Sequence, residues 1–285
     1  MTGPVVQLFV NPRSGSFGRR RINRLQRAFE AAGATVRVKP SISDRLEADP
    51  DADHLCVAGG DGTLRHAVEA LHRSNRAIPI SIYPAGTVNL FARERGYPRA
   101  AEAFVRRVLG ADAGVSHHSA LVAGLPLLTC ASVGPDSHVV DRLSPRLKAW
   151  IGRAAYLVAF GRLLMDWPRP ALAVEWDGNR LECQAVYIAK GRYFAGPWSF
   201  APRARLTDPL LHVVTLQRAS RRDFMRFAWT MLRGRPVEAL EGVSTFTCAA
   251  LRITGDPGVP LQADGDVVAR LPATMALRPD PTLFA

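Results

Sequence analysis

The sequence has few cysteines and no long apolar run. Its 285 residues include four cysteines that lie far apart in the chain. This spacing excludes a CxxC zinc pattern and a dense disulfide framework, so we expect four reduced, buried thiols: Cys56, Cys130, Cys183 and Cys248. No stretch reaches the ~20 apolar residues of a membrane span, and residues 1–10 lack the basic start of a signal peptide. These absences predict a cytoplasmic protein.

Several familiar chemical signatures are also missing. Neither GxSxG nor HExxH occurs, which argues against two common kinds of hydrolase. The P-loop signature GxxxxGK[ST] is absent, and Arg65 stands where the third glycine of GxGxxG would be. His117, His118 and His138 lack the spacing of metal ligands. No RNP-like, zinc-finger or basic-region pattern occurs, so we expect no nucleic-acid partner.

Basic side chains are in excess. The 37 lysines and arginines outnumber the 25 acidic residues and give a formal net charge of +12. Such an excess favours a polyanionic partner, which could be nucleic acid, an anionic membrane surface or a phosphorylated substrate. An ordinary basic surface explains the charge equally well. The charge therefore does not choose among these partners.

The first part of the chain alternates short apolar runs with helical patterns. Apolar runs at 5–10, 54–58 and 80–83 are each followed by turn residues and then by residues at helical spacing. This alternation predicts a parallel sheet covered by helices. Ligands of such sheets bind outside the carboxyl ends of the strands. We therefore expect three loops to converge: 11–15, 59–63 and 84–89.

The pattern changes after about residue 115. Short β-rich runs follow, several with Asp-Gly or Asp-Pro-Gly turn signals, at 171–176, 180–189, 210–216, 245–254 and 267–271. Helical patterns interrupt them at 146–165 and 221–232. At about 100 to 200 residues per domain, the length also suggests two domains. We predict an α/β domain over 1–115 and a mostly antiparallel β domain over 116–285, whose last strand is a candidate to return to the first domain.

The segment Gly59-Gly60-Asp61-Gly62-Thr63 is a candidate phosphate site. A glycine loop that enters a helix offers backbone N–H groups and the positive helix end, and the missing Cβ atoms allow close approach. Asp61 would repel a phosphate unless a divalent cation lay between them, so the loop favours a Mg²⁺-bound nucleotide. On these residues alone, a tight turn between strand and helix is an equal alternative.

Three segments together carry a family resemblance: Asn11-Pro-Arg-Ser-Gly15, Gly59-Gly-Asp-Gly-Thr63 and Pro84-Ala-Gly-Thr-Val-Asn-Leu-Phe-Ala-Arg93. In this order and spacing they resemble the nucleotide-site motifs of the diacylglycerol kinase catalytic-domain family. That family includes diacylglycerol, sphingosine, ceramide and bacterial lipid kinases, and NAD kinases are more distant relatives. The resemblance continues through Ser132-Val-Gly-Pro-Asp136, Phe194-Ala-Gly-Pro-Trp198, Ala201-Pro-Arg-Ala204 and Gln262-Ala-Asp-Gly-Asp266.

The resemblance implies a fold and an ATP site. The implied fold is a Rossmann-like nucleotide-binding α/β domain followed by a β-sandwich, with the active site in the cleft between them. Asp61 would act through the Mg²⁺ of the nucleotide. The implied ATP-binding residues are Asn11, Pro12, Arg13, Ser14, Gly15, Gly59, Gly60, Gly62, Thr63, Thr87 and Asn89.

The segment 262–266 matches the family's late Asp-Gly-acid motif, whose final acid is a proposed general base. Phosphoryl transfer to a hydroxyl needs a group that accepts the proton, and a carboxylate can do this. We therefore predict Asp266 as the base and Asp264 as the second candidate, although many family members have Glu where Asp266 stands. From the residues alone, Asp264-Gly265 between two β runs is instead typical of a hairpin turn.

One metal-binding loop of the family is altered here. Family members commonly hold a structural Mg²⁺ with one Asp and neighbouring carbonyls of an Asp-Asp-Gly-Leu-Leu-Asp-like stretch, which here reads Thr207-Asp-Pro-Leu-Leu-His212. Asp208 keeps the ligand position. Thr207, Pro209 and His212 remove an acid, a glycine and a second acid, so the survival of this metal site stays open. Leu90 also replaces an acid of the third motif, which bears on acceptor choice.

The resemblance implies a kinase that transfers the γ-phosphoryl group of ATP to a lipid hydroxyl, such as that of diacylglycerol. Two alternatives stay open: a catalytically altered nucleotide-binding regulatory member, and a kinase of a soluble acceptor, as in NAD kinases. Retention of Asp61, Asp264 and Asp266 favours catalysis. The residues identify neither the lipid nor whether the chain forms a homodimer.

Two segments could bring such an enzyme to a membrane. Residues 221–235 mix aromatic and apolar side chains with arginines, and residues 150–167 are more apolar. Basic amphipathic helices bind membranes by burying an apolar face and attracting anionic headgroups. We predict peripheral binding to an anionic membrane surface through 221–235. The alternative is that both helices pack their apolar sides against the β domain.

Overall fold

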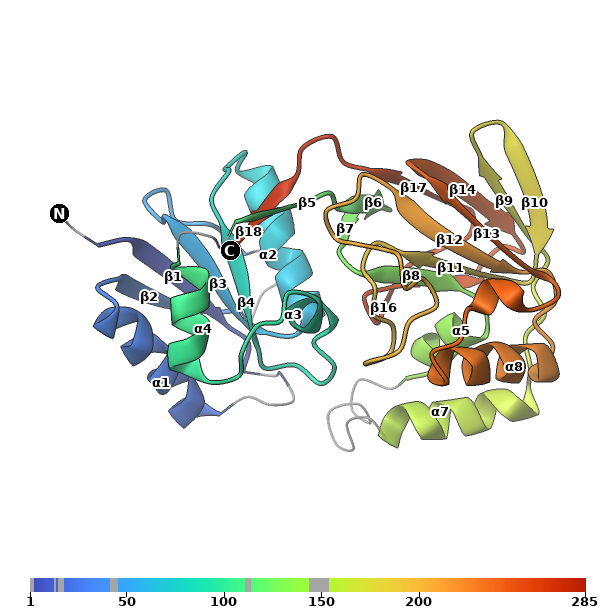
Figure 1. Cartoon of the computed structure of the whole chain (residues 1–285), viewed down its shortest axis with the longest axis horizontal. Coiled ribbons are helices and arrows are strands. Elements are labelled where there is room, and N and C mark those ends of the chain that lie inside the picture. The colour runs from blue at the N-terminus through green and yellow to red at the C-terminus, as the bar shows by residue number, and fades with distance from the viewer. Residues whose placement is uncertain (1–2, 13, 15–17, 42–45, 111–113, 144–153) are drawn as a thin grey trace. The chain divides into compact units, whose positions relative to one another are not determined.

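The computed structural model describes residues 3–12, 14, 18–41, 46–110, 114–143 and 154–285. The chain divides into two compact units. Unit 1 contains residues 1–117 together with 280–285, and unit 2 contains residues 118–279. Unit 1 is α/β and unit 2 is largely antiparallel β, which confirms the predicted fold class (Figure 1).

Unit 1 is built on a six-stranded sheet. Its strands are β1 (Val5–Val10), β2 (Thr35–Pro40), β3 (His54–Gly59), β4 (Ile80–Pro84), β5 (Val115–His117) and β18 (Thr282–Phe284). The strand order is β2-β1-β3-β4-β18-β5, and the first four strands are parallel. Strand β18 pairs parallel with β4 and antiparallel with β5. Continuous burial of β3 and β4 agrees with their uninterrupted apolar runs.

The helices described in unit 1 are α1 (Arg19–Ala31), α2 (Asp61–Arg73), α3 (Leu90–Glu94) and α4 (Ala101–Val108). Helix α1 buries Ile22, Leu25 and Phe29, whose spacing follows the helical repeat. The unit β1-α1-β2 extends from the middle of the sheet toward one edge, and the unit β3-α2-β4 extends toward the other edge. Right-handed crossovers then place α1 and α2 on opposite faces. The strand order reverses between β1 and β3, and α/β sheets bind ligands at such a reversal.

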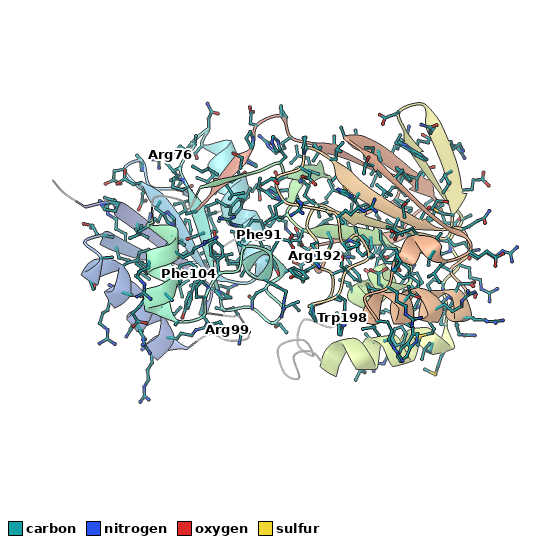
Figure 2. The ribbon with its side chains drawn as sticks, in the orientation of Figure 1. Arg76, Phe91, Arg99, Phe104, Arg192 and Trp198 are labelled. Carbon is teal, nitrogen blue, oxygen red and sulfur yellow. The ribbon has the colours of Figure 1, made fainter. Side chains whose placement is uncertain are left out.

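Aromatic rings fill much of the unit 1 core. Phe104 of α4 contacts Phe29, Tyr83 and Tyr97, with ring centroids 5.2 to 6.4 Å apart (Figure 2). Another pair joins α3 to β18: the rings of Phe91 and Phe284 lie 4.2 Å apart, and both side chains are fully buried. The last strand is therefore part of the same core as the loop that precedes α3.

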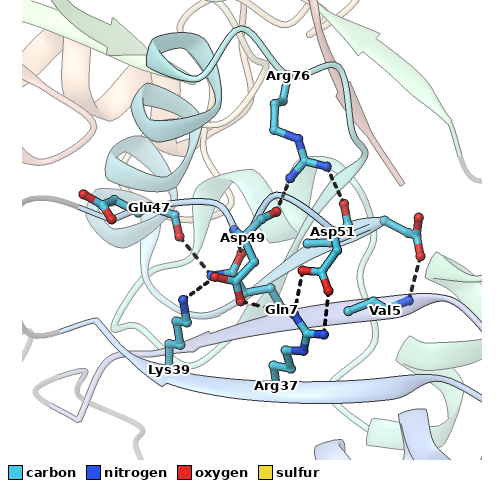
Figure 3. A network of polar contacts seen from close by, with 10 residues as sticks. Val5, Gln7, Arg37, Lys39, Glu47, Asp49, Asp51 and Arg76 are labelled. Carbon is cyan, nitrogen blue, oxygen red and sulfur yellow. Dashed lines mark hydrogen bonds and ion pairs between the residues drawn. The ribbon is translucent and has the colours of Figure 1, made fainter.

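Polar contacts fix the connection between β2 and β3 to the edge of the sheet (Figure 3). Gln7 is fully buried in β1, donates to the Glu47 carbonyl at 2.9 Å and accepts from the Asp49 N–H at 2.8 Å. Arg37 of β2 donates two 2.6 Å bonds to the Asp51 carboxylate. The buried amide of Gln7 is thus paired on both sides, which avoids the cost of an unsatisfied polar group.

Unit 2 is a sandwich of two six-stranded sheets. The first contains, in spatial order, β10 (Asn179–Cys183), β9 (Leu172–Trp176), β14 (Ala250–Gly255), β17 (Ala273–Leu277), β6 (Ala120–Val122) and β7 (Leu125–Leu127). The second contains β13 (Val243–Cys248), β12 (Leu211–Leu216), β11 (Ala185–Ala189), β8 (Cys130–Val133), β15 (Pro260–Ala263) and β16 (Asp266–Arg270). One apolar core draws buried residues from both sheets, such as Val174 and Ile253 from the first and Val186 and Val213 from the second.

Two segments that the sequence predicted as single strands each form two strands in different sheets. The run 180–189 breaks at Gln184 into β10 and β11, and the run 245–254 breaks at Ala249 into β13 and β14. At the first break, the Gln184 N–H donates to the Leu216 carbonyl, and its side-chain oxygen accepts from the Ala219 N–H. Both halves of each run have strand-forming residues, so the change of sheet leaves no local signal.

The helices described in unit 2 are α5 (Pro135–Asp141), α7 (Ala154–Met165), α8 (Arg221–Leu232) and the short 3₁₀ helix η1 (Val237–Ala239). The predicted helix over 221–232 is confirmed by α8. Of the predicted helix over 146–165, α7 forms the part from Ala154, and 146–153 lie outside the described residues. Among the helices that the structure describes, none is long and apolar enough to cross a membrane.

All four cysteines are free and buried, as predicted. Burial raises the pKa of the Cys56 and Cys183 thiols to about 12 and that of Cys248 to about 11. The thiolate is the reactive form of cysteine. These three side chains therefore act as small apolar core residues.

Candidate active site

The loops that follow β1, β3 and β4 lie together in unit 1. The Asn11 N–H donates to the Ala58 carbonyl at 3.1 Å, and the Ala85 N–H donates to the Gly59 carbonyl at 3.0 Å. The Asn11 amide Nδ2 also donates to Thr63 Oγ1 at 2.8 Å. The first motif is therefore joined to the second by a side-chain bond, and the second to the third through the backbone.

Close packing between these loops explains several glycines. A Cβ on Gly86 would lie 2.5 Å from the Gly60 Cα and 2.8 Å from Asn89 Oδ1. A Cβ on Gly59 would lie 2.8 Å from the Thr63 side chain. Real Cβ atoms do not approach other atoms this closely, so these positions require glycine for packing alone.

Asp61 holds the second loop against the third. Its buried carboxylate accepts the Leu90 N–H at 2.9 Å through Oδ2 and the Phe91 N–H at 3.0 Å through Oδ1. These are orphan donors of the first turn of α3, which a carboxylate satisfies well. The sequence predicted Asp61 as a partner of the nucleotide's Mg²⁺ and gave no sign of this capping role.

Asn89 shapes the turn that precedes α3. It adopts a left-handed conformation with φ of 56°, which asparagine tolerates better than most residues. Its side-chain oxygen accepts the Gly86 N–H at 2.7 Å, and its Nδ2 donates to the Gly86 carbonyl at 2.8 Å. The role of Asn89 in the described residues is therefore to close the loop on itself.

The other predicted ATP residues lie in the same loops. Ser14 Oγ donates to the Asn11 carbonyl at 2.8 Å, and Gly62 and Thr87 are half-buried. Pro12 is exposed, and Arg13 and Gly15 lie outside the described residues.

Arg21 of α1 is a contributor that the sequence did not reveal. Its guanidinium donates to the Tyr83 hydroxyl and to the Pro84 carbonyl, both at 3.0 Å, and lies 4.6 Å from the centre of the Tyr83 ring. These contacts fix the end of β4, where the third loop begins. Only the fold brings Arg21 to this strand end, since nothing local distinguishes it from the neighbouring arginines.

In unit 2, Asp264 and Gly265 form the turn between β15 and β16. Both have positive φ, at 50° and 87°, and Ala263 pairs with Asp266 across the turn. The hairpin that the residues alone suggested is thus present. The buried Asp264 carboxylate accepts the Leu128 N–H at 2.9 Å, and the Thr129 N–H and Thr129 Oγ1 at 2.8 and 2.6 Å. Asp264 therefore fixes the hairpin to the start of β8.

Three further titratable residues from the sequence analysis lie in different environments: Asp266, Asp208 and His212. Asp266 is half-buried at the first position of β16. Asp208 Oδ2 lies 3.7 Å from His212 Nε2. Burial lowers the pKa of His212, although the nearby Asp208 carboxylate opposes this. Within the described part of the chain, no three His, Cys, Asp or Glu side chains are grouped to hold a metal ion.

Comparison with known proteins matches both units. The model of the diacylglycerol kinase catalytic domain matches residues 5–117. The model of the YegS C-terminal NAD kinase beta sandwich-like domain matches residues 129–283, which is more than half of the chain. The chain belongs to the diacylglycerol kinase catalytic-domain family.

Individual relatives and solved structures point to the same family. The diacylglycerol kinase of Bacillus subtilis (strain 168) is 24% identical over 278 residues, covering 93% of this chain and 91% of the relative. A Pseudomonas aeruginosa (strain UCBPP-PA14) protein named "Probable lipid kinase YegS-like" is 32% identical over 221 residues, covering 74% and 69%. The crystal structure of a diacylglycerol kinase from Bacillus anthracis str. Sterne has a TM-score of 0.75 at 18% identity, covering 97% and 95% of the chains. These relatives support a kinase, and the last supports the fold.

One of the segments that resemble the family ends in a buried carboxyl, Asp136. Its Oδ2 accepts a hydrogen bond from Ser132 Oγ, which itself accepts from Gln262 Nε2 at 2.7 Å. Burial raises the pKa of Asp136 to about 6, although the bond from Ser132 opposes the rise. This environment could not be predicted from the sequence, because β8, β15 and α5 meet only in the folded chain.

We expect Asp136→Asn to make the stability of the chain less dependent on pH. A carboxyl whose pKa rises from 3.8 to about 6 on folding stabilises the fold fully below the lower value. This contribution is lost as the pH rises through about 6. Since pH 5 lies about one unit below the folded pKa, and one pKa unit corresponds to about 1.4 kcal/mol, the variant should gain about 1.4 kcal/mol relative to wild type between pH 5 and pH 8. Urea unfolding at both pH values measures this.

Asp256→Asn is the control for that prediction, because Asp256 is exposed. Its effect on the free energy of unfolding should be the same at both pH values within about 0.5 kcal/mol. An equal effect of Asp136→Asn at pH 5 and pH 8 would show that the Asp136 pKa is not raised by folding.

Proposed function

We propose that this chain is an ATP- and Mg²⁺-dependent lipid kinase, which transfers the γ-phosphoryl group of ATP to the hydroxyl of a diacylglycerol-like lipid. The observation that carries the proposal is the joining of the three motif loops at the strand-order reversal of unit 1, through Asn11, Thr63 and Asp61. The names of the relatives support a lipid as the acceptor.

Each loop has a role in binding ATP. Phosphate oxygens would accept hydrogen bonds from backbone N–H groups in the first turn of α2, where the helix end is positive. The glycines at 59 and 60 let the phosphates approach the backbone. Asn11 and Asn89 keep the first and third loops in place around this turn. Binding energy used for such positioning is the main protein contribution to phosphoryl transfer.

The residues also fit a nucleotide-bound cation. When bound, Mg²⁺ would neutralise charge on the phosphates. Asp61 is the first residue of α2, beside the N–H groups that would bind the phosphates, so its carboxylate would contribute to holding the ion. Asp266 is the proposed base: its half-buried carboxylate would take the proton of the lipid hydroxyl as the phosphoryl group is transferred.

The test is incubation of the purified chain with γ-labelled ATP, Mg²⁺ and separate acceptors. The panel includes diacylglycerol, phosphatidylglycerol, sphingoid bases and, as a soluble acceptor, NAD. We expect label in a lipid. Label in NAD alone would replace the lipid acceptor with a soluble one. If ATP binds but no acceptor is labelled, the chain is a regulatory nucleotide-binding member instead.

We also propose that the enzyme works at the cytoplasmic face of an anionic membrane and binds it through α8. The side chains of α8 separate into two groups. Phe227 and Met231 are buried in unit 2, whereas Met225, Trp229 and Leu232 are 50%, 58% and 44% exposed. The helical repeat puts these three exposed residues on one face. Along the same face lie Arg222, Arg226 and Arg233, all exposed, and the Arg233 guanidinium is 4.5 Å from the centre of the Trp229 ring.

Neighbouring rings hold α8 in this orientation. Phe224 of α8 contacts Phe160 of α7 and Trp167, with centroids 6.1 and 5.4 Å apart, so α7 and α8 lie side by side in unit 2 (Figure 1). The apolar surface is thus presented on a supported helix, next to basic groups that attract anionic headgroups. Cytoplasmic membrane surfaces carry such headgroups, and ATP is available on that side.

We expect Trp229→Ala to weaken binding to vesicles that contain phosphatidylglycerol by about tenfold, because an exposed indole loses its apolar burial in the interface. Co-sedimentation measures the bound fraction, and high salt should release wild type as well. Leu210→Ala is the control, since Leu210 is also exposed in unit 2 but lies outside α8. Wild type that does not bind the vesicles would refute this docking surface. So would vesicle binding that changes neither with salt concentration nor with the Trp229→Ala substitution.

A further inference from the structure

Lys190 is a fully buried cationic side chain in unit 2. It directly follows β11, and its exposed fraction is 0%. Its Nζ donates to three backbone carbonyls: Asp208 at 2.6 Å, Leu206 at 2.9 Å and Arg205 at 3.2 Å. A neutral amine has only two N–H donors, so three donated bonds identify the group as an ammonium ion. The carbonyls of one short loop therefore surround a positive charge.

The choice of lysine is itself informative. Of the 37 basic residues in the sequence, only three are lysines: Lys39, Lys148 and Lys190. An ammonium is a compact charge with three donors, whereas a guanidinium is a planar fork. Only the ammonium can direct three donors from one atom toward carbonyls that converge on a point. In a chain that otherwise uses arginine, lysine stands where this geometry is required.

This loop is the one for which the family resemblance implies a structural Mg²⁺. Here its carbonyls accept from Lys190, and the acids that would accompany Asp208 are replaced by Thr207 and His212. A divalent ion at these carbonyls would meet a buried positive charge with too few anionic ligands. The residues present therefore do not fit the metal.

We propose that the Lys190 ammonium replaces the structural metal ion and holds the loop 205–208 in its fold without any divalent cation. Three carbonyls of this loop accept hydrogen bonds from the positive charge of Lys190, which directly follows β11. The stability of unit 2 is then insensitive to removal of divalent metal. A metal ion bound with the nucleotide is a separate matter. This inference does not depend on the acceptor or on catalysis.

Thermal unfolding of the full chain without nucleotide is the first test. Wild type in excess EDTA and in millimolar Mg²⁺ should have the same Tm within about 1 °C. Lys190→Met, which keeps the aliphatic length and removes the charge, should lower the Tm by about 10 °C because it leaves three buried carbonyls unpaired. Lys39→Met is the matched control: Lys39 pairs with Asp49 at the surface and should change the Tm by no more than about 2 °C.

NMR of the chain labelled with ¹⁵N-lysine gives a second readout. It uses the wild-type chain, so it can be measured even if Lys190→Met does not fold. Wild type in EDTA should give one side-chain ammonium signal that exchanges slowly with water, as expected of a buried and bonded group. Lys39→Met should retain it. A wild-type Tm that falls in EDTA and recovers with Mg²⁺ would overturn the proposal. So would the absence of a protected ammonium signal in metal-free protein.

Discussion

Replacing Asp266 with asparagine is expected to lower kcat by about 10²- to 10⁴-fold, which is the usual contribution of a general base. An amide cannot take the proton of the acceptor hydroxyl. Asp266 is half-buried at the start of β16, and asparagine has nearly the same size and shape as aspartate. We therefore expect the Tm to stay within about 2 °C of wild type. The assay is transfer of label from ATP to the best lipid of the panel.

Asp266→Glu is the control for this substitution. Many family members have Glu in this place, so a carboxylate on a longer side chain should preserve most of the activity. Wild-type turnover by Asp266→Asn would remove Asp266 as the base. That result would leave the kinase assignment intact, because the assignment rests on the nucleotide loops of unit 1.

Asp264→Asn should instead act on stability, with an expected loss of about 3–5 kcal/mol in the free energy of unfolding of unit 2. Three backbone N–H groups, of Leu128, Thr129 and Cys130, and the Thr129 hydroxyl donate to the buried Asp264 carboxylate. Asparagine loses the charge and turns an N–H₂ group toward one of these donors, which leaves a buried polar group unpaired. Urea unfolding followed by Trp fluorescence measures the change, and two units require a check for separate transitions.

The matched control is Asp177→Asn. Asp177 and Gly178 form the same kind of turn between β9 and β10, with φ of 45° and 78°, but both residues are exposed. Asparagine suits this turn as well as aspartate does, so the stability should change by less than about 0.5 kcal/mol. Equal effects at Asp177 and Asp264 would show that the inward-facing bonds of Asp264 contribute little.

The nucleotide loops could be predicted because each follows from a local pattern. A buried strand, a glycine-rich turn and a periodic helix are contiguous in sequence, and parallel strands bring such turns to one edge. The partners within the site could not be predicted in this way. Asp61 binds the backbone at the start of α3, and Arg21 reaches the end of β4 from α1. These contacts depend on how separate elements pack.

The strands of unit 2 were harder to predict from the sequence. The strands β6 and β7 are three residues long, which is too short for an alternating pattern to appear, and the same holds for β5 and β18 of unit 1. Strand propensity also cannot say which of two sheets a segment joins, so the breaks at Gln184 and Ala249 were missed. Lys190 shows the same limit for a polar residue. A lysine after a strand is ordinarily solvated, and only the fold of 205–208 reveals its partners.

The position of β18 has a consequence for how the chain is made. This strand lies between β4 and β5 in the sheet of unit 1, but it follows all of unit 2 in sequence. During translation, the sheet thus keeps a gap until residues 118–279 have left the ribosome. Phe91, beside the helix end that Asp61 caps, gains its contact with Phe284 only then. The three motif loops therefore gain their last contact with the core late, so on the proposed function a nascent chain would order its ATP site only after its β-sandwich has been synthesised.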